Sequence, residues 1–361
     1  MFRNKFVAIV VPAYNEERHI AQVIESTPDL VDLLVVVDDG SSDATPNIVR
    51  DAQDPRVTLL RHSSNRGVGA AIVTGYRFAL EQGADVVGVM GGDAQMDTAH
   101  LPALLKPVVE GRCDFTKGNR FYSLRSWRGM PVHRAIGNVI LSFLTKPASG
   151  YWHVFDAQNG YTMISSGALR RLPLDRLETG YQFENRLLIY LNASDARVTD
   201  VPVPARYGDE ESGIKLWRDV PAILWTLLTG FLMRVRHKYL RERVAPAGTL
   251  ILSGILLLAF GLLMALWAWI TIEPPWLSWA VPASLSLAGV AVGSFIVMDL
   301  VASRGLRYRR QPASSERMHD QDMITEGDGV GPEAVNRPAQ RSESIEGIAT
   351  TRSAPEQESA R

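Results

Sequence analysis

Three groups of polar and acidic side chains each follow a short apolar run in the N-terminal part of the chain. They occupy residues 12–17, 38–43 and 92–97. In the third group, Asp93, Gln95 and Asp97 place three oxygen-bearing side chains within five residues. Carboxylate and amide oxygens are the ligands that hard cations such as Mg²⁺ and Mn²⁺ prefer, and such a cation neutralises a leaving diphosphate. The group predicts a metal site, with a turn that only caps the next helix as the alternative.

The other two groups carry side chains suited to a nucleotide. Asp38 and Asp39 end the second apolar run, where a carboxylate can accept a hydrogen bond from a ribose or a base edge. Pro12 ends the first run, Tyr14 can stack on a ring, and Glu16 lies at a helix start. Each group alone is also ordinary turn and capping chemistry. Their joint occurrence after successive runs favours a nucleotide site.

The elements that must position these groups alternate along the chain. Apolar runs predict strands at residues 6–11, 33–37, 57–60, 85–90, 114–117 and 197–203. Helices are predicted at residues 16–26, 43–51, 68–82, 98–109, 132–144 and 181–192, with N-caps at Asn15, Ser42-Asp43 and Asp97. This order favours an α/β fold with a mostly parallel, doubly wound sheet. Ligands bind such sheets beyond the carboxyl ends of the strands, which is where the three groups fall.

The C-terminal part contains two long uncharged segments. Residues 249–272 are 24 residues without a charge. As a helix they would be about 36 Å long, against about 30 Å for a bilayer core. Residues 277–298 are similar, and the short link between them forces an antiparallel hairpin. Arginines and lysines flank the hairpin at residues 234–243 and 304–310, which predicts that both ends are cytoplasmic.

These features divide the chain into four parts. We expect a catalytic domain at residues 1–213, an interfacial helical segment at 214–243, a transmembrane hairpin at 244–303, and a basic stop with a disordered polar tail at 304–361. The alternative for the second part is a buried core helix. The protein would then be a multi-pass protein of the cell membrane with a cytoplasmic catalytic domain. A net charge of −1 gives no field for nucleic acid, and a single cysteine, Cys113, excludes an intrachain disulfide.

Residues 5–215 resemble the family 2 glycosyltransferases, which have the GT-A fold. Four motifs stand in the family's order and spacing: Val10-Val11-Pro12-Ala13-Tyr14-Asn15-Glu16, Val37-Asp38-Asp39-Gly40-Ser41, Asn65-Arg66-Gly67-Val68-Gly69 and Gly92-Asp93-Ala94-Gln95. Within the family, the chain is most similar to polyprenyl-phosphate glycosyltransferases of the dolichol-phosphate mannose synthase type. The hairpin resembles that of bacterial polyprenyl-phosphate glucosyltransferases, which raises the expectation of a homo-oligomer.

The resemblance implies a role for individual residues. The residues implied in binding the nucleotide-sugar are Pro12, Ala13, Tyr14, Glu16, Val37, Asp39 and Asp93. Asp93 and Gln95 would bind the metal, and Arg120 would lie near the phosphates. Arg206 and Lys215 match a basic pair before the membrane-proximal helix, and Asp156 resembles an acid that follows the acceptor loop and orients arginines or sugar.

Arginine chemistry adds one candidate and the family pattern shows two departures. A guanidinium matches phosphate geometry, so Arg134 joins Arg120 and Arg206 as a candidate for the acceptor phosphate, with a plain surface charge as the alternative.

The first departure from the family pattern is at Gly91, where the family often has an acid. Asp97 or water would then complete the metal site. The stretch from Arg206 to Lys215 is also longer than usual.

The implied reaction moves a hexose, with inversion, from a UDP- or GDP-linked sugar to undecaprenyl or dolichyl phosphate. Arg120, Asp156 and Asp93 are the implied catalytic residues, with Mg²⁺ or Mn²⁺ as cofactor. One alternative is a processive polysaccharide synthase, although the sequence lacks that class's Gln-x-x-Arg-Trp motif. Another is a membrane-anchored protein that binds sugar nucleotides without catalysis, for which Gly91 is the best support.

Overall fold

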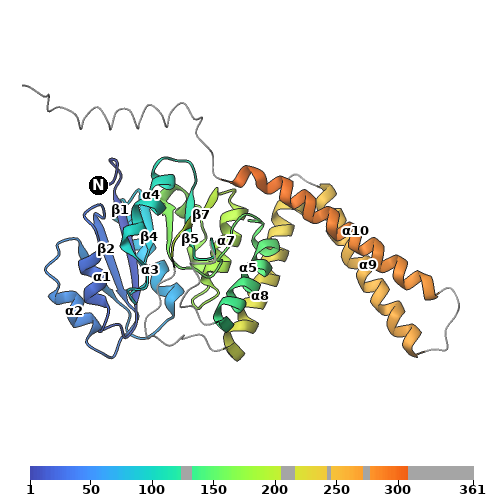
Figure 1. The fold of residues 1–361 in the computed structure, drawn as a ribbon, viewed down its shortest axis with the longest axis horizontal. Helices are drawn as coiled ribbons and strands as arrows, with labels where there is room; N and C mark the ends of the chain where they lie inside the picture. The colour runs from blue at the N-terminus through green and yellow to red at the C-terminus, as the bar shows by residue number, and fades with distance from the viewer. Residues whose placement is uncertain (123–131, 205–215, 242–244, 271–276, 308–361) are drawn as a thin grey trace, which may run out of the picture. The chain divides into compact units, whose positions relative to one another are not determined.

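The computed structural model describes residues 1–122, 132–204, 216–241, 245–270 and 277–307 (Figure 1). Within these residues the chain forms a seven-stranded sheet in the order β3-β2-β1-β4-β6-β5-β7. The strands are β1 (Val7–Ala13), β2 (Leu33–Asp38), β3 (Val57–Arg61), β4 (Val86–Val89), β5 (Phe115–Asn119), β6 (Thr162–Ser165) and β7 (Val198–Pro202). All the predicted strands are present. The strand that was not predicted is β6, whose four residues are too few to show a period.

The pairing explains why the site forms at one edge of this sheet. β1 pairs in parallel with β2 and β4, β2 with β3, and β5 with β7. Only β6 among the described strands runs antiparallel to its neighbours, β4 and β5. The mostly parallel sheet is therefore confirmed. Because Ala13 pairs with Asp38, and Met90 N–H donates to the Val10 carbonyl at 3.0 Å, the carboxyl ends of β1, β2 and β4 lie together.

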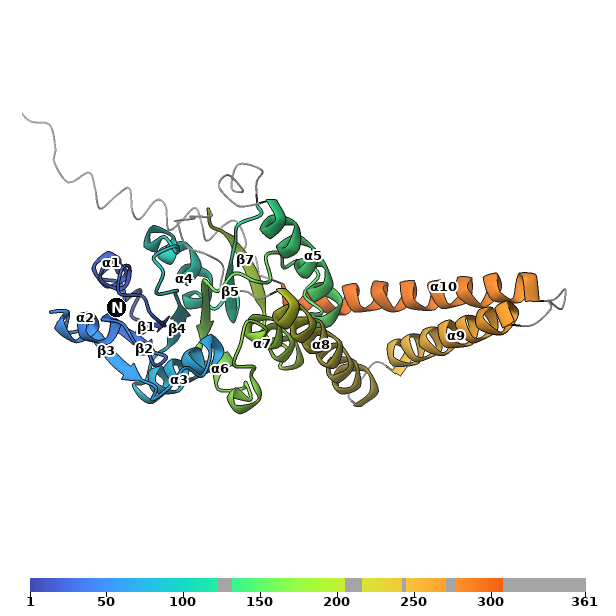
Figure 2. The same cartoon turned by 90° about the horizontal axis from the view of Figure 1, so that it is seen from below.

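Helices cover both faces of the sheet, as a doubly wound fold requires (Figures 1 and 2). They are α1 (Ile20–Ser26), α2 (Thr45–Asp51), α3 (Val68–Glu81), the 3₁₀ turn η1 (Thr98–His100), α4 (Leu101–Val109), α5 (Val132–Ser149), α6 (Ser166–Leu169), η3 (Leu174–Arg176) and α7 (Phe183–Ala193). Along β1, Ala8 and Val10 belong to the buried cluster under α3 and α7, whereas Val7, Ile9 and Val11 belong to the cluster under α1 and α4. This alternation is that of a strand buried on both faces.

The three predicted N-caps were right in one place and wrong in two, while the helix starts predicted at residues 68 and 132 agree with α3 and α5. Asp97 caps η1, since its Oδ1 accepts a hydrogen bond from Ala99 N–H at 3.1 Å. The prediction that Asn15 caps a helix from residue 16 was wrong, because α1 begins at Ile20. Asn15 has a φ of 58°, and its side chain bonds to the neighbouring loop instead. The second helix likewise begins at Thr45 rather than at residue 43.

The C-terminal part of the described chain is helical. It contains α8 (Leu216–Val235), the π-helical turn η4 (Arg236–Arg241), α9 (Ala245–Ile270), α10 (Leu277–Ser303) and the 3₁₀ turn η5 (Arg304–Leu306). α9 and α10 pack along each other. Thr249–Trp267 and Val281–Leu306 are long and apolar enough to cross a membrane, and only 17% and 22% of their most apolar windows are buried. The predicted link at residues 273–276 and the tail from residue 308 lie outside the described residues.

Candidate functional site

The loops after β1 and β2 are tied to each other by hydrogen bonds. Asn15 N–H donates to Ser41 Oγ at 2.9 Å, and Ser42 N–H donates to Asn15 Oδ1 at 2.9 Å. Glu16 N–H donates to Thr45 Oγ1 at 2.8 Å. The first two groups of polar residues therefore form one rim, although about thirty positions of sequence separate them. Tyr14 is 47% exposed on this rim, which leaves its ring able to stack.

The loop after β4 lies directly beside that rim. A Cβ built on Gly92 would come within 3.1 Å of the Pro12 carbonyl oxygen and within 3.3 Å of Ala13 Cβ and Glu16 Cγ. Any side chain at this position would push the two loops apart. Glycine thus lets the turn that carries Asp93 approach the β1 loop, and the three groups come together as predicted.

Three of the six described non-glycine residues with positive φ lie in loops around this edge, and the other three lie elsewhere. Among the described non-glycine residues with positive φ are Asn15 (58°), Ala94 (55°) and Asp156 (51°). Asn15 lies after β1, Ala94 after β4, and Asp156 between α5 and β6. A non-glycine residue in this region costs on the order of 1–3 kcal/mol and persists where the surroundings fix it, as in binding sites. The alanine is the least expected of the three, because it has no polar side chain to bond its own backbone.

Asp39 is buried beneath the rim and holds the loop between β3 and α3. Its Oδ1 accepts from Arg66 N–H at 2.9 Å, and its Oδ2 accepts from Gly67 N–H at 2.7 Å. His62 Nδ1 lies 2.6 Å from Oδ1. A carboxylate offers about four lone-pair positions, so these three bonds leave about one for a ligand.

His62 links Asp39 to α3. Its Nδ1 faces the Asp39 carboxylate, and its Nε2 lies 2.9 Å from Thr74 Oγ1. The Thr74 hydroxyl also lies 3.0 Å from the Ala70 carbonyl, one turn earlier in α3. The buried ring therefore connects the residues after β2 to α3. A lone histidine after a strand gave no sequence signal for this role.

The donor set for a cation is sparse. Asp93 is half-buried, and its Oδ1 accepts from Gln95 N–H at 3.1 Å. Within the part of the chain that the structure describes, no three His, Cys, Asp or Glu side chains gather to hold a metal. Asp97 uses Oδ1 as the cap of η1, and its role as a ligand stays a prediction. Mg²⁺ usually binds one or two carboxylates together with substrate phosphates, so Asp93 with Gln95 fits a cation that arrives with a diphosphate.

Gly91 fits the same sparse arrangement. A Cβ at Gly91 would lie 2.9 Å from Asp93 Oδ1. An acid at this position, as is frequent in the family that the sequence resembles, would require the Asp93 side chain to move. In this structure, the loop after β4 is therefore arranged around one carboxylate, that of Asp93.

Arg120 and Asp156 form a two-pronged ion pair beyond β5. Asp156 Oδ2 accepts from Arg120 Nε at 2.8 Å and from its backbone N–H at 2.9 Å, while Oδ1 accepts from Nη2 at 2.8 Å. The carboxylate is fully buried. A paired, planar guanidinium has a fixed direction, so this contact gives a structural basis for the predicted orienting role of Asp156.

One buried and two half-buried charges near this pair escaped the sequence analysis. Lys117 is buried in β5, donates to the Asn159 carbonyl, and has its pKa lowered by burial. Burial raises the pKa of Glu184, and the nearby Lys117 opposes that shift. Asp200 Oδ2 accepts from Phe155 N–H at 2.7 Å and from Asn119 Nδ2 at 3.0 Å, and burial raises its pKa to about 7.

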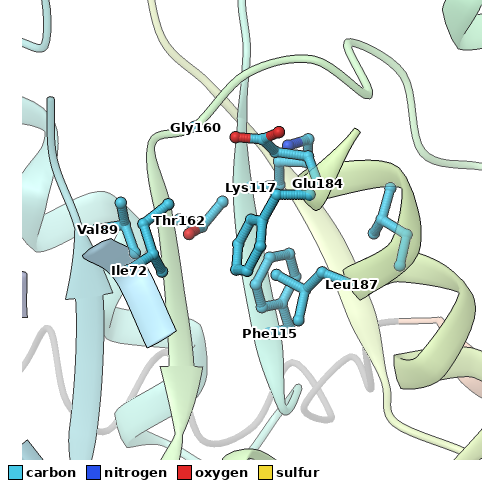
Figure 3. A pocket seen from close by; sticks show the side chains of 10 residues that line it. Ile72, Val89, Phe115, Lys117, Gly160, Thr162, Glu184 and Leu187 are labelled. Atoms are coloured by element: carbon cyan, nitrogen blue, oxygen red, sulfur yellow. The ribbon is translucent and has the colours of Figure 1, made fainter. Parts of the chain in front are cut away.

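A small pocket runs beside these charges, between the sheet and α7. Figure 3 shows the Glu184 carboxylate and the Lys117 amine at one end of the pocket, with Phe115 and Leu187 toward the other. Gly160 lies at the charged end, and a Cβ built on it would come within 3.5 Å of Met96 Cε in the β4 loop. Glu184 thus lies close to the loop that carries Asp93.

The structure describes only two of the four residues that were predicted to bind the acceptor phosphate. Arg134 belongs to the first turn of α5. Arg206 and Lys215 lie outside the described residues. Of the four predicted phosphate ligands, only Arg120 can be assigned contacts, and the others stay predictions.

Comparison with known proteins agrees with this geometry. Residues 8–172 match the family model described as glycosyl transferase family 2. The chain is similar to the UDP-N-acetylglucosamine–dolichyl-phosphate N-acetylglucosaminyltransferase of Methanococcus voltae, with 28% identity over 56% of this chain and 87% of that one. It is also similar to the undecaprenyl-phosphate mannosyltransferase of Micrococcus luteus, with 30% identity over 55% of this chain and 82% of that one.

Solved structures show the same fold. The glucosyl-3-phosphoglycerate synthase of Mycobacterium tuberculosis, in complex with UDP, matches with a TM-score of 0.50 and 23% identity over 64% of this chain and 80% of that one. A second structure of that synthase, with Mn²⁺, UDP and glucosyl-3-phosphoglycerate, has a TM-score of 0.49 at 22% identity over 64% of this chain and 80% of that one.

Proposed function

Because the chain belongs to glycosyltransferase family 2, we propose that it moves a hexose from a nucleotide-diphosphate sugar to a polyprenyl phosphate, with inversion. The observation that carries the proposal is the junction of the β1, β2 and β4 loops at one sheet edge, where Gly92 brings Asp93 beside Pro12 and Glu16. Relatives named for dolichyl and undecaprenyl phosphate support the lipid acceptor.

The rim holds the donor. The exposed ring of Tyr14 stacks on the base, and the remaining lone pair of Asp39 accepts from the nucleoside. Pro12, Ala13, Glu16 and Val37 line the same edge. The donor is UDP- or GDP-linked.

Asp93 and Gln95 would hold Mg²⁺ or Mn²⁺, with Asp97 or water completing the set. When bound, the cation supplies charge neutralisation for the leaving nucleoside diphosphate. Arg120 adds a fixed positive charge on the acceptor side, because Asp156 sets its direction.

The acceptor needs little activation. The second pKa of a phosphate monoester is about 6, so at neutral pH the lipid phosphate is largely a dianion. One of its oxygens attacks the anomeric carbon, and the bond from that carbon to the diphosphate breaks with its electrons passing to the nucleoside diphosphate. No proton moves, so the protein's task is to align the two substrates and stabilise charge. Arg120, Arg134, Arg206 and Lys215 bind the acceptor phosphate.

The membrane meets the protein at α5, α8 and the hairpin. α5 and α8 lie side by side (Figure 2). Each has large apolar side chains exposed on its surface. The exposed residues are Ile136, Ile140, Phe143 and Leu144 on α5 and Leu224, Trp225, Leu228 and Leu232 on α8. The opposite face of α8 packs Ile223 and Leu227 on Ala148 and Ile189. This two-helix surface rests in the headgroup layer on the cytoplasmic side, and α9 and α10 cross the membrane as part of a multi-pass protein.

The reaction can be tested directly with the full-length protein in detergent or nanodiscs. UDP-glucose, UDP-N-acetylglucosamine and GDP-mannose are each supplied with undecaprenyl phosphate and Mg²⁺ or Mn²⁺, and lipid products are detected by mass. A lipid-linked monosaccharide is expected from at least one donor. A polymer would instead indicate a processive synthase, and nucleotide binding without any product would indicate a binding protein.

A further inference from the structure

An acidic side chain lies inside the apolar helix α10. Asp299 belongs to the segment Val281–Leu306 and is only 1% exposed. Burial of a carboxylate in such a helix is costly unless it is paired, and a paired acid there usually has a function. Its partner is Arg234 of α8, which is fully buried: Nη1 lies 2.7 Å from Oδ1, and Nη2 lies 3.1 Å from Oδ2.

Arg234 also holds the end of α5. Its Nη2 donates to the Pro147 carbonyl at 2.7 Å, and its Nε donates to the Ala148 carbonyl at 3.1 Å. A Cβ built on Gly150 would lie 2.5 Å from Arg234 Nη1, and Gly150 has a φ of 75°. The chain that leaves α5 is thus shaped around this guanidinium, which joins α5, α8 and α10.

Asp299 reaches past Arg234 to the next loop. Trp152 Nε1 donates to Asp299 Oδ2 at 2.8 Å, and Tyr239 Oη donates to Oδ1. Phe295, one turn before Asp299, makes edge-to-face contacts with Tyr239 and Phe231 and closes the site off with apolar rings. Trp152 is therefore the residue at which α10 contacts the loop that leads to Asp156.

The rest of that loop is fixed from Trp152 to Asp156. Lys146 Nζ donates to the carbonyls of Trp152 and Val154, both at 2.8 Å. Phe155 N–H donates to Asp200, and Asp156 holds Arg120. A continuous series of contacts runs from a membrane-crossing helix to the arginine on the acceptor side.

We propose that Asp299, held by Arg234, is a positioning residue that fixes Trp152 and through it the loop that orients Arg120. The inference rests on the proposed function and deepens it: the hairpin sets the geometry of the acceptor phosphate site as well as anchoring the enzyme. The donor site is built from the β1, β2 and β4 loops, which are tied to one another, so the coupling acts on the acceptor alone.

Trp152→Phe tests the central contact, because it keeps an aromatic ring while removing the N–H donor together with part of the indole. The KM for undecaprenyl phosphate should rise about tenfold, the scale of one hydrogen bond to a charged group, while UDP affinity measured by calorimetry stays unchanged. The matched control is Trp279→Phe, at a residue of α10 that is 67% exposed, and it should change neither value. An unchanged acceptor KM in Trp152→Phe, or an equal loss of UDP affinity, would overturn the proposal.

A double-mutant cycle separates positioning from simple stability. Trp152→Phe combined with Asp299→Asn should raise the acceptor KM no further than Asp299→Asn alone, whereas additive effects would contradict a shared contact. Replacing the pair together, as Arg234→Met with Asp299→Leu, also leaves Trp152, Tyr239 and two carbonyls of α5 without their partners, so the melting temperature should fall. At temperatures where this variant is still folded, its acceptor KM should stay raised. A wild-type KM in that apolar variant would mean that the pair is only structural, and the proposal would fail.

A third measurement does not depend on the reaction. In the absence of any substrate, Asp299→Asn should speed amide hydrogen exchange at residues 150–156 relative to wild type, with no change at residues 33–38 in β2. If wild type makes no lipid-linked sugar but this exchange difference appears, the proposed function fails and the coupling stands. If transfer occurs and the exchange is unaltered, the coupling fails alone.

Discussion

Asp39 illustrates how individual residues of the nucleotide edge are held. It is buried, and its oxygens accept from two backbone amides and from His62. The other ring nitrogen of His62 contacts Thr74, so the ring connects the buried carboxylate to α3. The loop at residues 65–67 then keeps one shape whether or not a nucleotide is present.

His62→Gln should weaken UDP binding about tenfold, because it removes the imidazole that contacts the Asp39 carboxylate and leaves the loop less fixed. Calorimetry measures the affinity. An unchanged UDP affinity would contradict the role of His62 in holding Asp39.

Asp200 should make stability depend on pH. Its pKa is raised by burial to about 7 from an ordinary value of 3.8, so between these values the folded state keeps a proton that the unfolded state has lost. Stability therefore falls as pH rises from about 4 to about 7, by up to about 1.4 kcal/mol per pH unit. The charges of Lys117 and Asp156 also act on the Asp200 carboxylate. Both residues are present in the wild type and in the variant with which it is compared below.

The comparison is thermal unfolding of wild type and Asp200→Asn from pH 5 to pH 8. The asparagine keeps an acceptor for Phe155 and Asn119 but cannot titrate. The difference in stability between the two proteins should shift in favour of the variant as pH rises. Parallel curves at all pH values would show that Asp200 does not titrate in this range.

At the residue level, the sequence predicted which side chains lie together where the motif is compact. Asp93, Pro12 and Glu16 occur in compact motifs at strand ends, and the parallel sheet brings them together. Prediction failed for Lys117 and Asp200, which look like isolated charges in strands. Their meaning comes from partners distant in sequence, such as Asn159 for the first and Phe155 for the second.

Within the part of the chain that forms the sheet, α3 packs very closely against β1. A Cβ built on Gly75 would lie 2.3 Å from Val10 Cγ1 and 2.8 Å from Val10 Cγ2. Since both methyl groups of Val10 are close, rotation of the valine side chain does not make room for a larger residue. The small residues of α3 can pack on β1 only at this short distance.

Gly75→Ala should destabilise the protein by about 1–3 kcal/mol, the usual cost of overpacking a core. Adding Val10→Ala should cost less than the sum of the two single changes, because the clash is relieved. The matched control is Gly137→Ala in α5, where a Cβ would meet nothing within 4 Å and helix propensity should give a gain of up to about 1 kcal/mol. Denaturant unfolding measures all four; a neutral Gly75→Ala would refute the close contact.

Element-level prediction was good for strands and weaker at helix starts. The runs that became β1, β2 and β4 are apolar because both their faces are covered. The start of α1 was misplaced because the side chain of Asn15 bonds across to Ser42, and sequence patterns describe only local bonds. β6 was missed for its shortness and its antiparallel direction.

Over the whole molecule, the account requires the catalytic domain and the tail to lie on the cytoplasmic side of the membrane. The protein is well suited to labelling, because its single cysteine, Cys113, is buried and burial raises its pKa to about 12. That thiol stays protonated and inaccessible, so wild type should give no background.

Single cysteines introduced as Glu273→Cys and Ser314→Cys should report the two sides. A membrane-impermeant maleimide applied to intact cells should label Glu273→Cys only, and Ser314→Cys should react after the membrane is opened. Labelling of Ser314→Cys in intact cells, or of neither variant until the membrane is opened, would contradict the proposed topology.

The most direct test of the account is the initial rate of lipid-linked sugar formation by wild type and by Asp93→Asn across a titration of Mn²⁺. The proposed site requires that the wild-type rate rise with the cation, and that the variant lose on the order of a hundredfold to a thousandfold at every concentration, the usual loss when one charge-stabilising group is removed. UDP should still bind the variant, because the Asp39 loop is intact. A variant that transfers sugar at the wild-type rate would contradict the central claim that chemistry takes place at Asp93.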